Sequence, residues 1–362
     1  MEHKIIGKMR EKPNLSRNKH LLKLTDYTRE ELQTIIDLAL LLKDASKDGV
    51  EIPLLKGKNF AILFQEPSLR TRVSFEVAMS QLGGHALYIS GNTIYPDQHE
   101  SMRDTAEILS RMTDGVVLRV GQHETMEDFA KFAFTPVIDG CSSCTDEATH
   151  PTQIIADFIT MREHLPETRW EDMTVLRVGD LNMDPSHYGM MARCLSQMCA
   201  IFGVTFIACC PKGYEMSNVD IDYFNEQAKT SGAKIIFTND PYEYVDRADF
   251  IFADGFFYSS NDDPEYVRMR REALMPYQVN QELINRAPEH VGVMHCLPGH
   301  RNDEITTEVW DGPNSLLFEE AENRLHAQKA ILTWLLYKPQ PDEKVVEYHT
   351  KRVEDFIKLH NF

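Results

Sequence analysis

Five consecutive residues, Ser68–Arg72, combine two guanidinium groups with two hydroxyl groups. They follow an apolar run at Phe60–Phe64 and a turn at Pro67, and they precede Val73–Leu82, whose pattern predicts a helix. The backbone N–H groups at a helix start are unpaired, and together with arginine donors they bind phosphate groups. The segment therefore predicts an oxyanion site. The alternative is an arginine-rich helix start in which the serine is only a cap.

A second polar motif is His150-Pro151-Thr152-Gln153. Proline suits the first position of a helix. His150, Gln153 and Asp157 then fall on one helix face, because they are spaced three and four residues apart. Polar groups at a spacing that usually carries apolar residues predict a lined cavity. The alternative is a histidine at a helix end with two solvated partners.

The third motif, His295-Cys296-Leu297-Pro298, follows an apolar run at Val291–Met294. A cysteine beside a histidine suggests a thiol nucleophile. Adjacent residues in an extended segment point to opposite faces, however, so we do not expect His295 to activate Cys296. The cysteine either lines a pocket with its backbone and sulfur or is a small buried hydrophobic residue at a strand end.

The fourth motif is Glu322–Arg324, which we expect to open a helix that ends at Leu336. Its arginine is either a third guanidinium in the same site or the surface partner of Glu320. Both readings fit the sequence, because glutamate and arginine four residues apart on a helix form ion pairs.

Two further charged residues stand where apolar, strand-like runs end. Asp254 follows Phe250–Ala253 and precedes a loop rich in aromatic and acidic residues. A carboxylate there suits an ammonium ligand, and its alternative is an ordinary turn aspartate. Arg119 lies at the end of the run Val116–Val120, and we group it with the phosphate-binding residues.

The patterns of common metal and cofactor sites are incomplete in this sequence. Cys141 and Cys144 have the spacing of metal ligands, but no second cysteine or histidine pair completes the set. Gly179 follows a strand-like run, yet the next glycine is Gly189, so no dinucleotide fingerprint forms. We therefore expect no metal and no cofactor.

Strand-like and helix-like segments alternate along the whole chain. This alternation predicts an α/β fold with two domains, each a mostly parallel sheet flanked by helices, and an active site in the cleft between them. The predicted strands are Phe60–Gln65, Val116–Val120 and Thr135–Ile138, followed by Thr174–Val178, Thr205–Ala208, Lys234–Phe237, Phe250–Ala253 and Val291–Met294. The predicted helices include Arg29–Leu42, capped by Asp26, and Thr152–His164, which links the two halves.

The tail Pro339–Phe362 follows a Pro-Gln-Pro break and predicts an extra amphipathic helix. Such a helix either covers its own subunit or contacts a neighbour, and the reach of a tethered terminal helix favours the neighbour. Its predicted apolar positions are Val345, Val346, Val353, Phe356, Ile357 and Leu359.

Composition limits the class of protein. The chain has 362 residues, 42% of them hydrophobic and 26% charged, as in an ordinary globular protein. A net charge of −18 argues against nucleic acid and anionic membranes as partners. No apolar stretch reaches the length of a membrane helix, and the charged start Met1–Arg10 has no signal core. Seven cysteines fit reduced thiols, so we expect a cytoplasmic protein.

The four motifs, in this order, resemble the aspartate/ornithine carbamoyltransferase family, and the resemblance spans about Leu22 to Leu336. His-Cys-Leu-Pro resembles the ornithine and putrescine branches rather than the aspartate branch. Tyr277–Gln281, Phe318–Leu325 and the tail helix are most similar to putrescine carbamoyltransferases.

This resemblance implies an enzyme that binds carbamoyl phosphate first and a small amine second. It implies a carbamoyl-phosphate-binding domain at residues 1–163, completed by C-terminal helices at 323–362, and an amine-binding domain at 164–322. It also implies a homotrimer, or a dimer of trimers, with active sites at subunit interfaces. No family cofactor is implied.

The resemblance also assigns roles by motif. Phosphate would be held by Ser68, Arg70, Thr71 and Arg119. The carbamoyl carbonyl would be polarised by Thr71, Arg119 and His150, and the carbamoyl amide oriented by Gln153, Arg324 and the Cys296–Leu297 backbone. Leu69, Arg72 and Asp254 complete the implied substrate-binding set. Such fixed donors would stabilise the oxyanion formed when an amine attacks.

Departures from the family pattern lie mostly on the amine side. Leu69 stands where most members carry threonine, and Cys141–Thr149 is longer than usual. Asp254 is followed by Gly-Phe rather than x-Trp and a Ser-Met-Gly loop. Thr93 and Tyr95 replace glutamines in the loop that a neighbouring subunit inserts. Ornithine and putrescine are the default acceptors, and these departures leave a different amine or amide open. The alternative to an enzyme is a non-catalytic paralogue that binds carbamoyl phosphate.

Overall fold

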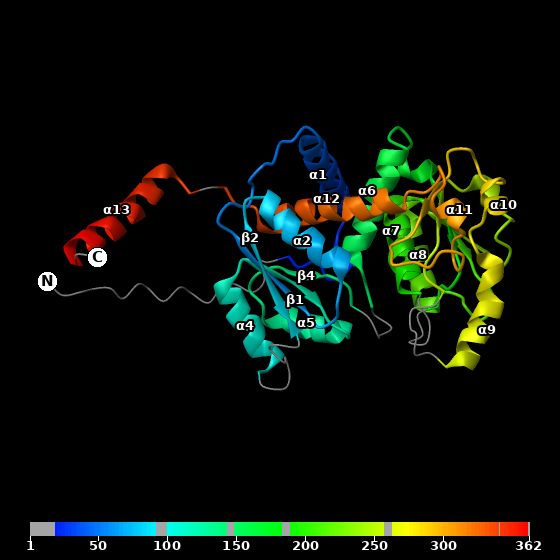
Figure 1. The fold of residues 1–362 in the computed structure, drawn as a ribbon, viewed down its shortest axis with the longest axis horizontal. Helices are drawn as coiled ribbons and strands as arrows, with labels where there is room; N and C mark the ends of the chain where they lie inside the picture. Colours follow the sequence, from blue (N-terminus) through cyan, green and yellow to red (C-terminus); the bar gives the residue numbers. More distant parts are fainter. Residues whose placement is uncertain are drawn as a thin grey trace.

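A computed structural model describes residues 19–91, 100–142, 148–182, 189–256, 263–339 and 341–360. Within these residues the chain forms two parallel β-sheets, each flanked by helices on both faces (Figure 1). The predicted fold class, an α/β protein with two such sheets, is confirmed.

The first sheet has the strand order β2-β1-β3-β4, and all of its neighbours are parallel. Side chains alternate between its faces. Phe60, Ile62 and Phe64 pack toward α1 and α2, while Ala61 and Leu63 pack toward α4 and α5. The elements are β1 (Asn59–Phe64), β2 (His85–Ser90), β3 (Gly115–Arg119), β4 (Val137–Asp139), α1 (Arg29–Lys47), α2 (Leu69–Gln81), α4 (Met102–Met112) and α5 (His123–Phe132).

The second sheet has the order β7-β6-β5-β8-β9 and is also parallel throughout. Its strands are β5 (Thr174–Val178), β6 (Thr205–Cys209), β7 (Lys234–Thr238), β8 (Phe250–Phe252) and β9 (Gly292–Met294). One face is covered by α7 (Met190–Phe202) and α8 (Asn218–Ser231), and the other by α9 (Pro264–Leu274), α10 (Gln281–Ile284) and α11 (Thr307–Trp310).

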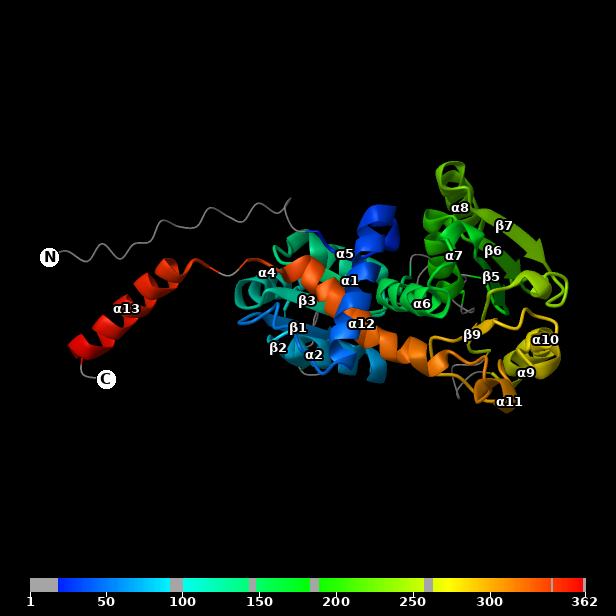
Figure 2. The same ribbon diagram turned by 90° about the horizontal axis from the view of Figure 1, so that it is seen from above.

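Two long helices connect the sheets. Helix α6 (Pro151–His164) carries the chain from the first sheet toward the second and is buried along most of its length. Helix α12 (Leu317–Leu336) returns from the second sheet and packs against α6, α1 and α2 (Figure 2). Residues from both halves of the chain therefore meet where α6 and α12 cross the gap between the sheets.

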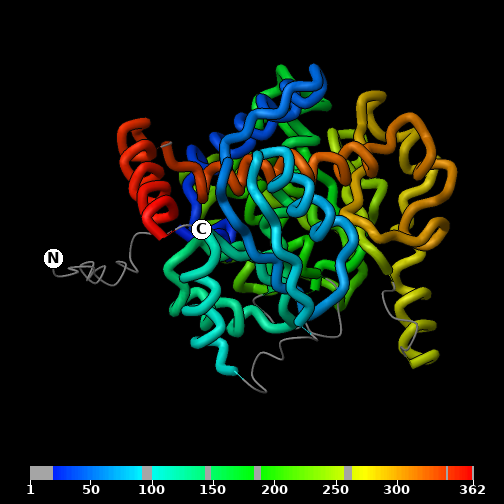
Figure 3. The backbone as a smooth tube through the Cα atoms, turned by 60° about the vertical axis from the view of Figure 1, so that its left-hand side comes forward, coloured from blue at the N-terminus to red at the C-terminus, as the bar shows by residue number. Residues whose placement is uncertain are grey.

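The C-terminal helix α13 (Glu343–His360) lies apart from the rest of the protein (Figures 1 and 2), and Figure 3 shows it in red at the end of the chain. It has no buried residue, and all six of its predicted apolar positions are exposed. The prediction of an amphipathic tail helix is confirmed. In the described part of the chain, no helix combines the length and the apolar character that a membrane span requires.

The structure changes several predicted boundaries. Helix α1 is capped by Thr28 rather than Asp26, because Thr28 and Glu31 form a reciprocal capping box. Helix α2 begins at Leu69, four residues before the predicted start, so Leu69–Arg72 form its first turn. The strand predicted at Thr135–Ile138 begins later, at Val137.

Two further predictions of secondary structure were wrong or incomplete. The motif Glu322–Arg324 does not open a helix, because α12 already begins at Leu317. The edge strand β2 was not predicted: its side chains are exposed or only partly buried, and its apolar run, Ala86–Ile89, is only four residues long. The other predicted strands are present, with ends within one or two residues.

Candidate active site

The polar motifs of the first half lie at one edge of the first sheet. Arg119 ends β3 and is paired in register with Phe64, the last residue of β1. Helix α2 begins after β1, and His150 precedes α6 after β4. Carboxyl ends of parallel strands form the usual ligand-binding edge of such sheets. The fold thus brings Ser68, Arg119 and His150 to this edge.

Arg324 of α12 is the centre of a buried hydrogen-bond network. Its Nη1 donates to Oε1 of Gln153 over 2.5 Å. Its Nη2 donates to the hydroxyl of Thr71 over 3.2 Å and to that of Thr152 over 3.3 Å. Arg324 is 2% exposed, so it does not pair with Glu320 on the surface. The other alternative, a third guanidinium in the predicted site, is retained. Helices α2, α6 and α12 are joined through this one guanidinium.

His150 is buried among positive charges. Burial is the main cause that lowers the pKa of His150 well below its usual value, and Arg324, Arg119 and Arg70 lower that pKa further. The imidazole is therefore neutral at physiological pH, with one N–H to donate. The three guanidiniums that act on this pKa also show that four of the predicted site residues lie close together.

Some guanidinium donors of this cluster have no acceptor in the part of the chain that the structure describes. The Nε atoms of Arg119 and Arg324 are buried and have no hydrogen-bond partner among the described residues. Arg119 has only a long ion pair, 3.8 Å, with Glu66. Burial lowers the pKa of Arg324 to about 10, which still leaves it charged at neutral pH. Such donors in a region of low dielectric suit an anion.

The residues at the start of α2 differ in their position relative to the buried cluster. Ser68 is the N-cap residue, but its side chain makes no capping hydrogen bond, so its role as a mere cap is excluded. Thr71 is buried, whereas Leu69 is 73% exposed. Arg72 donates to Glu76 over 3.0 Å, and its guanidinium lies 3.6 Å from the ring centre of Tyr88. Within this chain, Arg72 and Leu69 therefore lie outside the buried cluster.

Asp254, Cys296 and Arg177 form the wall contributed by the second sheet. Asp254 is buried; its Oδ1 lies 3.6 Å from the sulfur of Cys296 and its Oδ2 3.7 Å from Nη2 of Arg177. Burial, followed by the nearby carboxyl groups, raises the pKa of the Cys296 thiol well above its usual value. The thiol is therefore protonated, which excludes it as a nucleophile.

The backbone at Leu297 adopts a left-handed conformation with φ of 54°, followed by a cis peptide bond to Pro298. Its N–H donates to Nδ1 of His295 over 2.8 Å. The Nε2 of His295 lies 3.2 Å from Glu304, so this ring and the Cys296 thiol have different partners, as the alternation predicts. A non-glycine residue in this region costs about 1–3 kcal/mol and is typical of functional sites.

Sequence reasoning missed the role of two buried carboxyl groups, Asp157 and Glu320. The Nε2 of Gln153 donates to Oδ1 of Asp157 over 2.8 Å and to Oε1 of Glu320 over 2.9 Å. Glu320 also accepts the backbone N–H of His295 over 2.8 Å. The helix spacing had placed Asp157 beside Gln153, but nothing local in the sequence shows that Glu320 is buried.

A second missed group supports the loop before His150. The Oδ2 of Asp139 accepts the hydroxyls of Ser142 over 2.9 Å and Thr149 over 2.5 Å, and Nδ1 of His123 lies 3.1 Å from the Ser142 hydroxyl. The N–H of Ser142 donates to the carbonyl of Thr149 over 3.1 Å. These contacts join Ser142 to Thr149 and fix Thr149, the residue that precedes His150. Asp139 ends β4, so the strand-end argument that selected Arg119 and Asp254 also applies to it.

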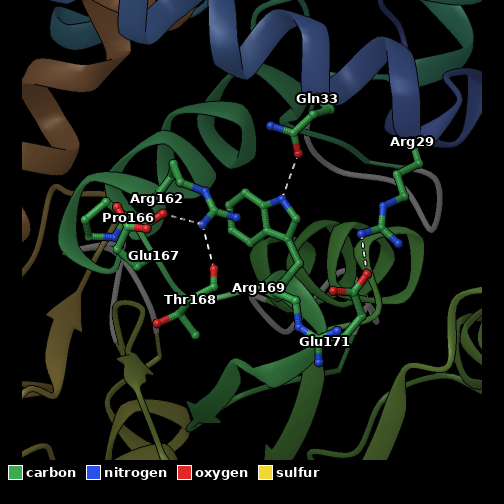
Figure 4. Close-up of a pocket in the computed structure, with 9 residues that line it drawn as sticks. Arg29, Gln33, Arg162, Pro166, Glu167, Thr168, Arg169 and Glu171 are labelled. Carbon is green, nitrogen blue, oxygen red and sulfur yellow. Dashed lines mark hydrogen bonds and ion pairs between the residues drawn. The ribbon is translucent and has the colours of Figure 1, made fainter.

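One open pocket lies away from this cluster, between α1 and the turn after α6 (Figure 4). It has a volume of about 380 Å³. Its polar groups bind one another: the indole N–H of Trp170 donates to Gln33 over 2.7 Å, and Arg29 pairs with Glu171 at 2.5 Å. We interpret this pocket as part of a polar contact between the N-terminal and C-terminal halves of the protein.

Among the described residues, His300, Asp303 and Glu304 are the group with ligand atoms close enough to hold a metal, within 4.8 Å of one another. Asp303 pairs with Arg271, and Glu304 accepts the N–H of His300. Cys144 of the incomplete ligand pair lies outside the described residues, as do Thr93 and Tyr95.

Two family models together match most of the chain. The model described as "Aspartate/ornithine carbamoyltransferase, carbamoyl-P binding domain" matches residues 19–163. The model of the "Asp/Orn binding domain" of the same family matches residues 171–335.

Individual proteins agree with these models. The ornithine carbamoyltransferase of Archaeoglobus fulgidus is 41% identical over 320 residues, which cover 88% of this chain and 98% of that protein. The solved ornithine carbamoyltransferase of Pyrococcus furiosus superposes with a TM-score of 0.80 at 38% identity, covering 89% of this chain and 98% of that one. The ornithine transcarbamoylase of Giardia lamblia gives a TM-score of 0.77 at 29% identity, covering 90% and 100%.

Proposed function

Because the chain belongs to the aspartate/ornithine carbamoyltransferase family, and is therefore a carbamoyltransferase, we propose that it transfers the carbamoyl group from carbamoyl phosphate to the side-chain amine of ornithine. The observation that carries this proposal is the buried contact of Arg324 with Gln153 and Thr71 beside the neutral His150. Relatives named ornithine carbamoyltransferase, at about 40% identity, support ornithine over putrescine as the acceptor.

The phosphate end of carbamoyl phosphate would bind at the start of α2. Ser68, Arg70 and Thr71 belong to this start, whose first backbone N–H groups have no intrahelical acceptor. The Nε of Arg119 has no hydrogen-bond partner in the part of the chain that the structure describes, so it is available to a phosphate oxygen. A dianionic group would offset the positive charge that Arg70, Arg119 and Arg324 place around His150.

The carbamoyl group would lie toward His150 and Gln153. A neutral imidazole donates its N–H to the carbonyl oxygen, and Thr71 and Arg119 would add donors to the same oxygen. Arg324 and the amide oxygen of Gln153 would orient the carbamoyl NH₂, together with the Cys296–Leu297 backbone. As the amine nitrogen attacks the carbonyl carbon, charge builds on this oxygen, and the bond from carbon to the phosphate oxygen then breaks.

The amine would approach from the side of Asp254 and Cys296. Acidic groups surround the Cys296 sulfur, since Asp254, Glu320 and Asp157 all act on its pKa. An acidic wall attracts an ammonium group, which must lose a proton before it attacks. That first proton leaves to water before the attack. Once the C–N bond has formed, the nitrogen carries a surplus proton, which the departing phosphate can accept, so no protein nucleophile is needed.

The arrangement of the chain supports the proposed domain division. Residues 1–163, completed by the C-terminal helices at 323–362, would form the carbamoyl phosphate domain, and 164–322 the amine domain. In support, α12 packs against α1, α2 and α6. A homotrimer or dimer of trimers, with α13 on a neighbouring subunit, is supported by the exposed apolar face of α13. We also propose a cytoplasmic location.

The test is an assay of phosphate release from carbamoyl phosphate with a panel of acceptors: ornithine, putrescine, lysine and oxamate. We expect the highest kcat/KM with ornithine. A higher value with putrescine would reassign the acceptor but keep the reaction. Tight binding of carbamoyl phosphate without turnover of any acceptor would contradict the proposal and support the non-catalytic alternative.

A further inference from the structure

The carboxyl groups of Asp157 and Glu320 lie side by side inside the protein, on one amide nitrogen of Gln153, and two buried acids this close favour a hydrogen bond between them. Each side chain is 1% exposed, and both accept an N–H from the same amide nitrogen, Nε2 of Gln153. A hydrogen bond between two carboxyl groups requires a proton on one of them, because ionised carboxylates only accept. The pair thus resembles the shared-proton carboxyl dyads in which like charges a few ångströms apart cannot both ionise.

The hydrogen bonds also indicate which carboxyl group carries the proton. Both oxygens of Glu320 accept from fixed protein donors, Oε1 from Gln153 and Oε2 from the backbone N–H of His295. Among the residues that the structure describes, Asp157 accepts such a donor at Oδ1 alone, again from Gln153. A proton on either oxygen of Glu320, or on Oδ1 of Asp157, would compete with an N–H that donates to the same oxygen. The second oxygen of Asp157 has no such donor among the described residues.

We propose that Asp157 and Glu320 share one proton, carried on Asp157, and that this pair fixes the amide of Gln153 with its oxygen toward Arg324 and the carbamoyl group. The inference rests on the proposed function, because Gln153 matters only if it binds the carbamoyl NH₂. With both hydrogens of its NH₂ held by the two carboxyl groups, Gln153 cannot flip its amide, and the lone pairs of its oxygen are directed away from them. Asp157 and Glu320 act here as positioning residues.

The surroundings keep the proton in place. Asp157 lines a small cavity of about 10 Å³, room for about one water molecule, with mainly apolar walls. Burial raises the pKa of both carboxyl groups, so the pair retains a proton, and the donors around it decide which carboxyl group carries that proton. The titratable and charged groups that face the pair are Arg324 on α12, Arg177 on β5, Asp254 after β8 and Cys296 after β9.

The proposal predicts an asymmetry between two conservative variants. In Asp157→Asn, the new oxygen accepts from Gln153 and the new NH₂ donates to Glu320, as the protonated aspartic acid does. In Glu320→Gln, the new NH₂ must face a donor, either Gln153 or the His295 N–H. We expect a loss of kcat on the order of 10²-fold for Glu320→Gln, the effect of removing one transition-state hydrogen bond. The rate of Asp157→Asn should exceed that of Glu320→Gln at least about tenfold.

Asp157→Ala provides a second measure, because it leaves both donors of Glu320 satisfied and removes only the shared proton and one acceptor. It should be slower than Asp157→Asn. Glu319→Gln, on the exposed side of the same helix, is the matched control with wild-type rates. Equal rates for Asp157→Asn and Glu320→Gln, or a faster Glu320→Gln, would overturn the assignment.

The pH profile separates a shared proton from a purely structural role. Wild type should lose the proton as pH rises, so that repulsion between the two carboxylates disturbs Gln153. An asparagine cannot lose it, so the ratio of the Asp157→Asn rate to the wild-type rate should rise with pH. A ratio independent of pH would contradict the proposal.

An infrared measurement tests the pair without any turnover. At neutral pH, wild type and Glu319→Gln should show a carbonyl stretching band of a protonated, buried carboxylic acid, and Asp157→Asn should lack it. Absence of the band in wild type would refute the shared proton. If the band is present but no acceptor is carbamoylated, the proposed function fails while the carboxyl pair stands.

Discussion

The Nη1 of Arg324 donates to Oε1 of Gln153 over 2.5 Å, although 171 positions separate the two residues in the sequence. This contact exists because α12 returns from the second sheet and packs along α6. The helix that closes the chain therefore completes a site begun by the first sheet. A substitution in α12 should consequently behave like one in the motif at His150.

Arg324→Lys should lower kcat on the order of 10²–10³-fold, with little change in the melting temperature. An ammonium group cannot reach Gln153, Thr71 and a substrate at once, because it lacks the planar fork of a guanidinium. Steady-state kinetics and thermal denaturation measure the two effects. Arg103→Lys on the exposed surface of α4 is the control and should match wild type. A loss of kcat of less than tenfold would show that Arg324 does not contact the carbamoyl group in the transition state.

Arg70→Ala and Arg72→Ala should differ in their binding of carbamoyl phosphate. Arg70 acts on the pKa of His150, whereas Arg72 pairs with Glu76 and stacks on Tyr88 outside the cluster. Isothermal titration calorimetry should show affinity reduced on the order of 10²-fold or more for Arg70→Ala, and by less than about threefold for Arg72→Ala. Comparable losses of affinity in both variants would show that Arg72 also binds carbamoyl phosphate, for instance in the active site of a neighbouring subunit.

His150 should leave a specific signature in stability at acid pH. Its pKa in the folded protein lies well below the value of about 6.5 in the unfolded chain, because of burial and three arginines. Unfolded chains therefore bind a proton below about pH 6.5 that folded chains do not, and stability is lost as the pH falls. His150→Gln removes this loss, so the melting temperature of wild type minus that of the variant should shrink from pH 7.5 to pH 5.

Activity offers a second readout of the same shift. Because the proposed donor is a neutral imidazole, protonation of His150 should not lower the kcat of wild type near pH 6.5. The pH profiles of kcat for wild type and His150→Gln should therefore have the same shape near that pH. An acid limb at that pH, present in wild type and absent in the variant, would mean that His150 titrates normally.

Much of the site was predictable because it follows strands. Buried parallel strands are continuous apolar runs, so the residues at or just after their ends, among them Arg119, Asp254 and Cys296, could be placed at sheet edges from sequence alone. The capping box at Thr28 and Glu31 was also present in the sequence, and Asp26 was preferred wrongly.

Glu320 could not be placed from sequence. Its burial depends on Gln153 and on the backbone of His295, which lie far away along the chain. A helix pattern that reads Leu-Phe-Glu-Glu gives no sign that one glutamate is enclosed and its neighbour exposed. Polar residues in a core are specified by distant partners, whereas apolar runs are specified by the segment itself.

The apolar face of α13 should hold copies of this chain together. Val353 is 60% exposed and Phe356 54%, and apolar side chains lined up along one exposed helix mark interaction surfaces. The double variant Val353→Glu and Phe356→Glu should lower the sedimentation coefficient or raise the dissociation constant of the oligomer. Lys351→Gln with Lys358→Gln changes the net charge equally on the other face of the helix and should match wild type. An unchanged mass in the glutamate variant would show that α13 is not required for assembly and that its apolar face has another partner.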